Sequence, residues 1–407
     1  MGNTASGDYV VNGGAIYADE IVLKGGTVAV QSNRAEGSGV TRGGALYSAS
    51  GDIELAGGTV TVQSNDATSV NSEAYGGALC SYRGGIELSA DEVTVSDNRA
   101  SGKAMVYGGA LYARKNITLT GGAITVRGNE AVRSGDNDNG KAYGGALFSD
   151  RGVVTLSADG AVTVTGNSLS GDTHGAYGGA VYASGDIKLT GETITLESND
   201  VSGGEEEVDG GALYSPHGGI SLTGGSIDAR GNTALSFGNR ARGGAMYAQD
   251  GGIELSADDL IELSGNRAVS EKATSQDGLA GGGALYSHSG DIRLYGASIA
   301  VRGNEAVSSA DRALGGALTV WKNGGIELSA DTFIELTGNR AAGSTSSDEK
   351  MGGGTLNALS GNIRLTGGAI TVQSNDAVNK SGHVYGGALF AGGSIDMTGS
   401  SITVASR

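Results

Sequence analysis

The residues of this chain that could catalyse a reaction are paired carboxylates, and the reaction would be the cleavage of a glycan. Polysaccharide lyases and glycoside hydrolases need acidic side chains that converge on one surface. Glu54 and Glu87 are expected on neighbouring outward positions, and Glu262 and Glu335 two repeats apart with Ala300 between them. We interpret both pairs as parts of a solvated strand face. Our prediction is therefore a non-enzymatic protein, with a glycan lyase or hydrolase as an alternative.

Metal and cofactor chemistry has little support in the sequence. Cys80 is the only cysteine, so an intrachain disulfide is excluded, and no Cys/His cluster has the spacing of a zinc site. The acidic runs at residues 136–139 (Asp-Asn-Asp-Asn) and 205–207 (Glu-Glu-Glu) have the oxygen ligands that calcium prefers. We predict no cofactor and no metal site, and we leave weak calcium binding open.

A repeat must position all of these residues. The tripeptide Gly-Gly-Ala, with one Gly-Gly-Thr variant, recurs every 30 to 39 residues, which is typical of a repeat protein. The repeats start near Gly13, Gly43, Gly76, Gly108, Gly144, Gly178, Gly210, Gly243, Gly282, Gly315, Gly353 and Gly386. We therefore expect a lead-in at 1–12 and one domain of twelve repeats at 13–407, as a fragment of a longer chain.

Within each repeat the hydrophobic pattern alternates with period two, which indicates strands and excludes helices. Ile53 and Leu55 would face inward from one short strand and Val60 and Val62 from the next, while a third strand follows the glycines. A single repeat cannot bury enough apolar surface to fold alone, so the repeats must stack. This predicts an all-β parallel β-helix, or β-solenoid, of about 12 coils with three short strands per coil and a variable loop at one corner.

The strand after the glycines carries two ranks of side chains. One rank, which includes Leu46, is always aliphatic, and we expect it inside the coil. Its neighbour is usually aromatic, as at Tyr47, and we expect that rank outside or under the loops.

An asparagine ends the last strand of nearly every repeat. At this bend asparagine tolerates left-handed backbone, and its amide can bond to the next coil. We predict a structural ladder that does not bind ligand, made of Asn33, Asn65, Asn98, Asn129, Asn167, Asn199, Asn232, Asn266, Asn304, Asn339 and Asn375.

Charges that follow these asparagines also indicate the register. No two successive repeats have the same sign at this position, which holds Arg34, Asp66, Arg99, Glu130, Ser168, Asp200, Thr233, Arg267, Glu305, Arg340 and Asp376. Like charges at coil spacing would repel one another, so the alternation predicts direct stacking of one repeat on the next.

Net charge narrows the possible partners. The chain carries −17 at pH 7 and has a pI near 4.6, which argues against nucleic acid and against an anionic membrane surface. Neither a signal peptide nor an apolar run of membrane-spanning length is present in this sequence.

Polar insertions of variable length separate each asparagine from the next pair of glycines. They would emerge at one edge of the coils, where repeat proteins usually bind partners. Tyrosines close several of these insertions, and we identify them as possible ligand contacts, with packing over the corner as the alternative: Tyr75, Tyr107, Tyr143, Tyr177 and Tyr385.

The paired motifs resemble the repeats of chlamydial polymorphic membrane proteins and related autotransporter passengers, which carry Gly-Gly-Ala-Ile and Phe-x-x-Asn. Here Gly13-Gly14-Ala15-Ile16 matches the first motif, and Val30-Gln31-Ser32-Asn33 matches the second with Val in place of Phe. The resemblance covers essentially the whole chain. It implies a right-handed β-helix at the bacterial cell surface, or secreted, that acts in adhesion.

Three functions follow as hypotheses. The first is a surface stalk or adhesin segment that binds a host or neighbouring-cell protein or glycan through its loop edge. The second is a structural fibre subunit that self-associates end to end through its open coil ends. The third is the glycan-cleaving enzyme already named.

Overall fold

The period-two pattern produces β-strands throughout. The structure, a computed structural model, describes residues 2–135, 140–171, 174–271, 278–309, 311–344, 351–380 and 382–406, and these residues include no helix. Equivalent strands of successive repeats pair in parallel and in register, for example Ile53 with Ile86. The prediction of an all-β, parallel β-solenoid with about 12 turns is confirmed.

The chain divides into two compact units. Unit 1 consists of Met1–Glu192 and Asn199–Gly204, and unit 2 consists of Thr193–Ser198 and Glu205–Arg407. From the sequence we expect one domain of twelve repeats, and the same coil is repeated within each unit.

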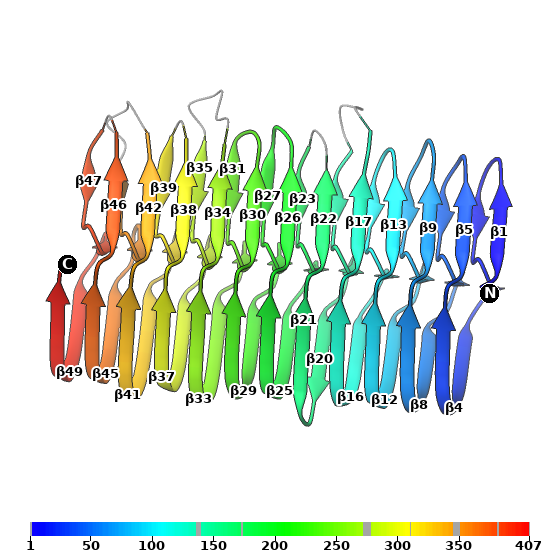
Figure 1. The fold of residues 1–407 in the computed structure, drawn as a ribbon, viewed down its shortest axis with the longest axis horizontal. Helices are drawn as coiled ribbons and strands as arrows, with labels where there is room; N and C mark the ends of the chain where they lie inside the picture. Colours follow the sequence, from blue (N-terminus) through cyan, green and yellow to red (C-terminus); the bar gives the residue numbers. More distant parts are fainter. Residues whose placement is uncertain are drawn as a thin grey trace. The chain divides into compact units, whose positions relative to one another are not determined.

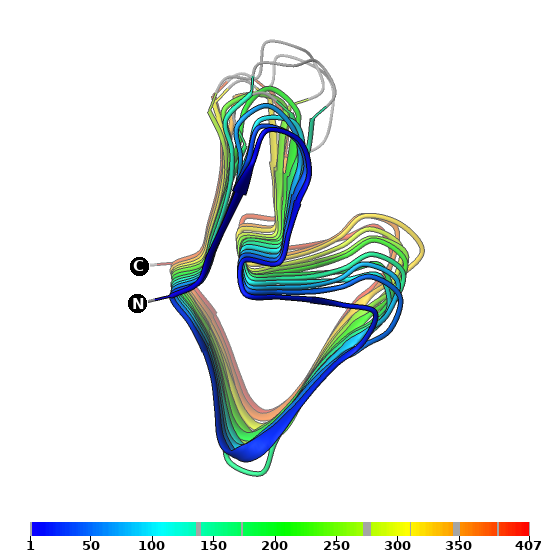
Figure 2. The same cartoon turned by 90° about the vertical axis from the view of Figure 1, so that its right-hand side faces the viewer.

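Each coil contributes strands to four parallel sheets (Figure 1). We name them by their place in the repeat: the pre-glycine sheet, the post-glycine sheet, the long sheet and the post-asparagine sheet. Within each unit, the post-asparagine and pre-glycine strands form a narrow arm, and the other two sheets enclose the wider part of the coil (Figure 2).

The strands of unit 1 follow this order in six coils. Its pre-glycine strands are β2 (Val11–Asn12), β6 (Thr41–Arg42), β10 (Ala74–Tyr75), β14 (Val106–Tyr107), β18 (Ala142–Tyr143) and β23 (Ala176–Tyr177). Its post-glycine strands are β3 (Ile16–Ala18), β7 (Leu46–Ser48), β11 (Leu79–Ser81), β15 (Leu111–Ala113), β19 (Leu147–Ser149) and β24 (Val181–Ala183). Its long strands are β4 (Ile21–Gln31), β8 (Ile53–Gln63), β12 (Ile86–Ser96), β16 (Ile117–Arg127), the pair β20 (Val154–Ala158) and β21 (Ala161–Thr165), and the first part of β25 (Ile187–Glu197). Its post-asparagine strands are β1 (Thr4–Gly7), β5 (Arg34–Gly37), β9 (Asp66–Ser69), β13 (Arg99–Gly102), β17 (Glu130–Arg133), β22 (Ser168–Gly171) and β26 (Asp200–Gly203).

Unit 2 repeats the same order. Its pre-glycine strands are β27 (Glu207–Asp209), β31 (Arg240–Arg242), β35 (Leu279–Gly281), β39 (Arg312–Leu314), β43 (Met351–Gly352) and β47 (Val384–Tyr385). Its post-glycine strands are β28 (Leu213–Ser215), β32 (Met246–Ala248), β36 (Leu285–Ser287), β40 (Leu318–Val320), β44 (Leu356–Ala358) and β48 (Leu389–Ala391). Its long strands are the last part of β25, β29 (Ile220–Arg230), β33 (Ile253–Ser264), β37 (Ile292–Arg302), β41 (Ile326–Thr337), β45 (Ile363–Gln373) and β49 (Ile395–Ala405). Its post-asparagine strands are β30 (Thr233–Ser236), β34 (Arg267–Ser270), β38 (Glu305–Ser308), β42 (Arg340–Gly343) and β46 (Asp376–Asn379).

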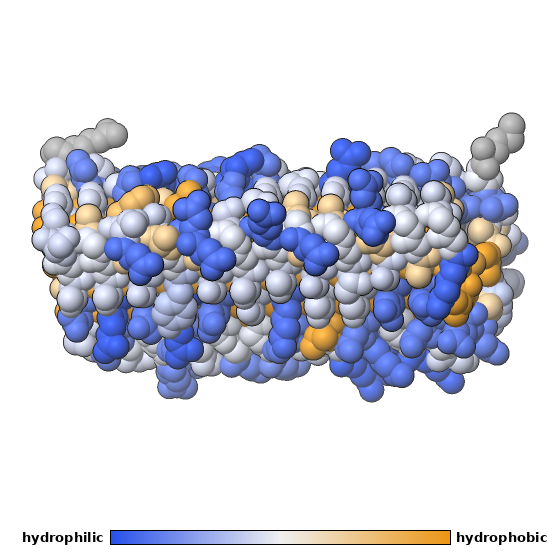
Figure 3. All heavy atoms as spheres, turned by 90° about the horizontal axis from the view of Figure 1, so that it is seen from below, coloured by the Kyte–Doolittle hydropathy of each residue, from blue (hydrophilic) through white to orange (hydrophobic). Residues whose placement is uncertain are grey.

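The structure adds detail to the prediction of three short strands per coil in two respects. The second and third predicted strands form one long strand of 11 or 12 residues in most coils, which bends at small residues such as Gly57 and Gly58. The polar insertions begin and end with short strands of their own, which lack a hydrophobic alternation long enough to recognise. The surface over the bends of the long strands is mostly intermediate to hydrophilic (Figure 3).

Aliphatic side chains fill the interior of the coils, as predicted. Ile53, Leu55, Val60 and Val62 of β8 are fully buried, and the same positions are buried in nearly every other coil. The arm is narrow, and its inward position after the asparagine is mostly alanine, as at Ala67. Small side chains there allow the post-asparagine and pre-glycine sheets to approach closely.

Backbone geometry explains the Gly-Gly pair. Gly43 has a φ of +64°, and a Cβ at this residue would lie 2.2 Å from the carbonyl oxygen of Leu46. A Cβ on Gly44 would lie 2.0 Å from the carbonyl oxygen of Gly77 in the next coil. The first glycine is therefore required by conformation, and the second by the contact between coils.

The predicted asparagines form hydrogen-bonded files within the units, and all but Asn375 are buried. Asn65 donates its main-chain N–H (3.0 Å) and its Nδ2 (2.9 Å) to Oδ1 of Asn98, and Nδ2 also donates to the carbonyl oxygen of Val30 (2.8 Å). One part of the expectation was wrong. The left-handed residue is the one before the asparagine, such as Ser64 at φ 54°, because the asparagine itself must direct its amide into the file.

Candidate binding surfaces

The loop edge consists of the segments that connect post-asparagine to pre-glycine strands. Strand bounds give these segments lengths from three to eight residues, shorter than the insertions in the sequence because the insertions contribute the strands that flank them. In Figure 2 the described segments lie together at the tip of the arm. Segments of different length thus leave each unit at a single edge, as the sequence predicted.

Apolar side chains are exposed along this loop edge. Tyr9 and Val10 are 84% and 54% exposed in the first connecting segment, Val70 is 54% exposed in another, and Phe237 is 44% exposed in unit 2. Most other large apolar residues of the described chain are buried in the coils. These exposed side chains are available to a partner, and burial of each by a partner would be favourable by about 1–3 kcal/mol.

Four of the five tyrosines identified in the sequence lie in one row of unit 1. This tyrosine ladder consists of Tyr75, Tyr107, Tyr143 and Tyr177 on the outward face of the pre-glycine sheet. It packs against a second row on the post-glycine sheet, which consists of Tyr47, Cys80, Tyr112, Phe148 and Tyr182. The pre-glycine and post-glycine strands, which carry these two rows, meet where the arm joins the wider part of the coil (Figure 2).

Ring geometry determines what the tyrosine ladder can contact. The rings of Tyr75 and Tyr107 have centroids 4.8 Å apart and are inclined by 18°, and those of Tyr107 and Tyr143 are 5.4 Å apart and inclined by 2°. The ring centroid of Tyr75 also lies 5.0 Å from that of Tyr112, with the two ring planes inclined by 88°. Neighbouring rings therefore cover the faces on which a sugar would stack, and ring edges and hydroxyl groups are what the ladder presents.

Two hydroxyl groups of the tyrosine ladder bond to residues that lie two positions earlier in the chain. The hydroxyl of Tyr75 donates to Glu73, and that of Tyr107 donates to the sulfur of Met105 at 2.7 Å. Burial raises the pKa of both phenols above the ordinary value of tyrosine. Tyr385, the fifth candidate, lies in unit 2, is 41% exposed and has its ring 6.2 Å from that of Phe390.

Cys80 takes an aromatic position in the second row and is completely buried. Tyr47 and Tyr112, in the neighbouring coils, hold the equivalent positions on either side of it. Burial raises the pKa of the thiol far above its ordinary range, so the reactive thiolate is disfavoured. The geometry gives this cysteine a packing role.

The same corner of unit 2 contains a buried ion-pair cluster that sequence analysis missed. Asp209 and Arg242 occupy the positions that tyrosines hold in unit 1, and Arg242 Nε and Nη2 donate to the Asp209 carboxylate at 2.8 and 2.9 Å. Arg242 also donates to Glu207 at 2.7 Å and lies 4.9 Å from the ring centroid of Tyr247. The available signal was two successive pre-glycine segments of opposite charge, Glu-Val-Asp and Arg-Ala-Arg.

Burial determines the proton affinity of this cluster. Desolvation raises the pKa of Asp209 to about 7, even though Arg242 opposes the shift. For Glu207, desolvation is outweighed by the attraction of Arg242 and Arg240, and its pKa lies below the ordinary value. The pKa of Arg242 is raised well above its ordinary value because its carboxylate partners outweigh desolvation, so the guanidinium stays charged.

The carboxylate pairs proposed for glycan chemistry lie where the sequence analysis expected them. Glu54 and Glu87 are neighbours in adjacent strands, and Glu262 and Glu335 flank Ala300. Arg302 lies between the second pair, 3.6 Å from Glu262 and 2.6 Å from Glu335. Hydrogen bonding to Arg302 lowers the pKa of Glu335, which is opposite to what a general acid requires.

Among the described residues, no three His, Cys, Asp or Glu side chains gather into a group that could hold a metal ion. The first acidic run proposed for calcium, 136–139, lies outside the described residues. In the second, Glu207 is paired with Arg240 and Arg242.

Fold and surfaces together define a parallel β-solenoid repeat protein with an acidic exterior. No family model, curated protein or solved structure matches the chain. In the part of the chain that the structure describes, no helix has the length and apolar character needed to cross a membrane.

Proposed function

We propose that this chain is a non-enzymatic segment of a bacterial cell-surface or secreted protein, and that it binds a host or neighbouring-cell protein or glycan through its loop edge. The loop edge is the observation that supports this proposal most directly. Segments of unequal length leave each unit at the tip of the arm, and they expose Val70 and Phe237 there. The resemblance to polymorphic membrane protein repeats supports the location and the adhesive role.

The coils form a constant scaffold, whereas the connecting segments at the loop edge vary from coil to coil. The sheets are held by in-register pairing and buried side chains, so their geometry is similar from coil to coil. The connecting segments vary in length and composition, and variation of this kind changes specificity without disturbing the coils. A rigid scaffold with one variable edge suits a protein that displays binding loops.

An adhesion assay with loop-edge variants tests this proposal. Fluorescent beads that carry the purified chain are applied to cultured animal epithelial cells and to bacterial cells. We expect adhesion above that of uncoated beads, and a loss of more than half of it in the double variant Val70→Ser, Phe237→Ser. The matched control is Arg83→Ser, in the turn between a post-glycine and a long strand.

Two results would contradict the proposal. One is adhesion no greater than that of uncoated beads on every cell type tested. The other is equal adhesion of the loop-edge variant and the parent chain, with circular dichroism showing that both are folded.

A further inference from the structure

One outward position of the long sheet holds arginine in unit 2 but not in unit 1. The position follows the first isoleucine or valine of each long strand. Unit 1 holds Val22, Glu54, Glu87, Thr118, Thr155 and Lys188 there, and unit 2 holds Ser221, Glu254, Arg293, Glu327, Arg364 and Asp396. Arginine occurs at this position twice, in β37 and β45, with a glutamate of β41 between.

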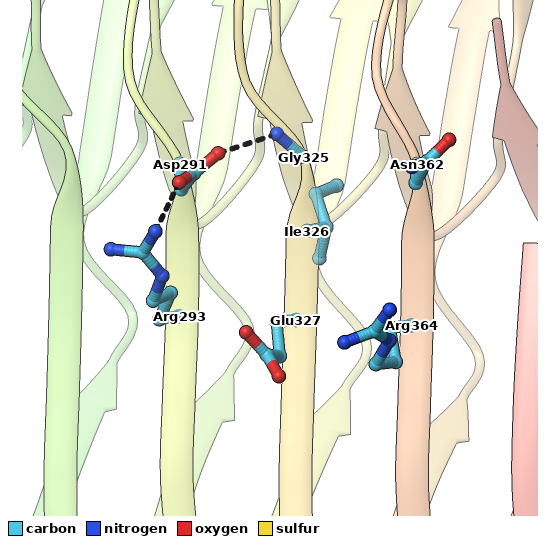
Figure 4. A pocket seen from close by; sticks show the side chains of 7 residues that line it. All are labelled: Asp291, Arg293, Gly325, Ile326, Glu327, Asn362 and Arg364. Carbon is cyan, nitrogen blue, oxygen red and sulfur yellow. Dashed lines mark hydrogen bonds and ion pairs between the residues drawn. The ribbon is translucent and has the colours of Figure 1, made fainter. Parts of the chain in front are cut away.

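These residues line a cavity of about 140 Å³. Arg293, Glu327 and Arg364 project from three successive long strands, and Asp291 and Asn362 lie at the end where these strands begin (Figure 4). Because neighbouring parallel strands are about 4.8 Å apart, the two arginines are about 10 Å apart along the stack.

Some polar groups of this cavity already have partners within the protein, and these contacts hold the edge of the cavity in place. Asp291 accepts a hydrogen bond from the main-chain N–H of Gly325 at 2.7 Å and pairs with Arg293. Asn362 accepts from the main-chain N–H of Ser394 at 2.8 Å. Asp291 and Asn362 therefore tie each strand to the next and hold the edge of the cavity.

The remaining groups retain binding capacity. Within the described residues, Arg364 forms no ion pair, and Glu327 pairs with no cation. Glu327 accepts one hydrogen bond, from the hydroxyl of Tyr295 at 3.2 Å. Tyr295 lies two residues after Arg293 on the same outward face, at a position that holds Lys, Ala, Ser or Thr in the other long strands.

We propose that this surface binds an acidic glycan whose uronic acids alternate with neutral sugars, with the glycan lying along the coils of unit 2. Carboxylates of two uronic acids pair with Arg364 and with the guanidinium N–H groups of Arg293 that do not contact Asp291, and hydroxyl groups of the sugar between them donate to Glu327. The planar guanidinium group matches a carboxylate with two parallel hydrogen bonds. Tyr295 adds an aromatic surface for a sugar ring beside the cavity.

Spacing supports this class of ligand. A β-linked sugar in an extended chain advances by nearly the distance between neighbouring coils, so one sugar corresponds to one coil. Arginines in every second coil then match acidic groups on every second sugar. A glycan with a carboxylate on each sugar would place one of them against Glu327, which would repel it.

The equivalent surface of unit 1 serves as an internal comparison. It forms a cavity of about 270 Å³ lined by Glu20, Asp52, Glu54, Glu87 and Lys115 among other residues. Its carboxylates outnumber its one cation, so it has no paired arginines to hold an acidic chain. The net charge of −17 also opposes non-specific binding of polyanions, which leaves local pairing with the two arginines as the basis for recognition.

Isothermal titration calorimetry tests the proposal with the full chain and an unsulfated hyaluronan octasaccharide, which alternates glucuronate with N-acetylglucosamine. We expect saturable binding that weakens as salt is added. The double variant Arg293→Gln, Arg364→Gln should weaken binding at least about tenfold, since each arginine supplies charge-assisted hydrogen bonds. Lys188→Gln is the matched control, because it removes a cation from the same outward position in unit 1. This control should bind like the parent chain.

Four outcomes would overturn the proposal. They are no binding of the octasaccharide by the parent chain, equal binding of a neutral chitin octasaccharide, equal affinity of the folded double variant and the parent, and binding of sulfated glycans alone. The site lies on the long sheet and not at the loop edge. Loss of binding to hyaluronan in this assay and loss of adhesion through Val70 and Phe237 are therefore separate results.

Discussion

Asn129 donates both its main-chain N–H, at 3.1 Å, and its side-chain Nδ2, at 2.9 Å, to the same oxygen, Oδ1 of Asn167 one coil further along. Asn167 in turn donates Nδ2 to the carbonyl oxygen of Val126 and to Oδ1 of Asn199, both at 2.9 Å. Each side chain thus joins three coils, and each is buried. At this bend the side-chain oxygen of the next asparagine accepts the main-chain N–H, while the carbonyl oxygen of each asparagine still accepts a main-chain N–H from the next coil, as Asn129 does from Ser168 at 2.9 Å.

Replacement of Asn167 by alanine should lower the free energy of unfolding by about 1–3 kcal/mol, because it leaves buried donors of Asn129 without an acceptor. Chemical denaturation of the parent and the variant measures the difference. Asn71→Ala is the control, since Asn71 is exposed in a connecting segment, and it should change stability by less than about 0.5 kcal/mol. Equal stability of the Asn167 variant and the parent would show that the file does not stabilise the coils.

Replacement of Tyr107 by alanine should destabilise unit 1 by about 2–4 kcal/mol. Its ring packs between those of Tyr75 and Tyr143 and against Phe148, and removal leaves a gap in the corner. Thermal or denaturant unfolding measures the effect. Tyr9→Ala, at an 84% exposed tyrosine, should be close to neutral. A neutral Tyr107 variant that lost adhesion instead would assign the ladder to ligand binding.

The free energy of unfolding should fall as the pH rises from about 4 to about 7, because Asp209 loses its proton in this range. Its pKa in the folded chain, about 7, is above the ordinary value of 3.8, so the folded state binds this proton more tightly than the unfolded state does. The contribution is fully present below pH 4 and is lost as the pH rises through 7, with a slope of up to about 1.4 kcal/mol per pH unit. Denaturation curves recorded across this pH range give the free energy of unfolding at each pH. This free energy should depend less on pH in the variant Asp209→Asn than in the parent. An identical pH profile for the variant and the parent would contradict the raised pKa.

Cys80 should resist thiol reagents in the folded protein at neutral pH, because the thiol is buried and its pKa is raised. Modification by a chromogenic disulfide reagent should become fast only when denaturant unfolds the chain. Rapid modification in native buffer would show that the corner of unit 1 opens on the timescale of the reaction.

The coil could be predicted from the sequence because its signals are periodic. Ile53 and Leu55 alternate with polar residues, and Arg99 follows Asp66 and precedes Glu130 at the same place in three repeats; the structure pairs these residues in register. Short strands such as β10 and β18 could not be predicted, since two residues carry no period. Their existence depends on the pairing of whole coils.

The candidate surfaces were only partly predictable for a different reason. The sequence showed that Tyr75 and Tyr107 precede glycine pairs, but it did not show that stacking covers their ring faces. Asp209 and Arg242 are 33 residues apart in the chain, and their pairing depends on the register of neighbouring coils. The sequence shows that Arg293 and Arg364 each follow the first isoleucine of a strand, whereas the cavity between them is a property of three packed strands.

All of these conclusions depend on one repeat per coil, and a crosslink tests that register most directly. In unit 1, Thr125 pairs with Thr163 of the next coil and with Thr94 of the coil before, so Thr94 and Thr163 are about 10 Å apart. Dibromobimane, which fluoresces when it bridges two neighbouring thiols, is added to the folded variants Thr125→Cys, Thr163→Cys and Thr94→Cys, Thr163→Cys; Cys80 is buried and does not compete. The account predicts a fluorescent bridge in the first variant and little or none in the second, with the bridged peptides identified by mass spectrometry. A bridge in the second variant and none in the first would contradict the stacking of one repeat on the next.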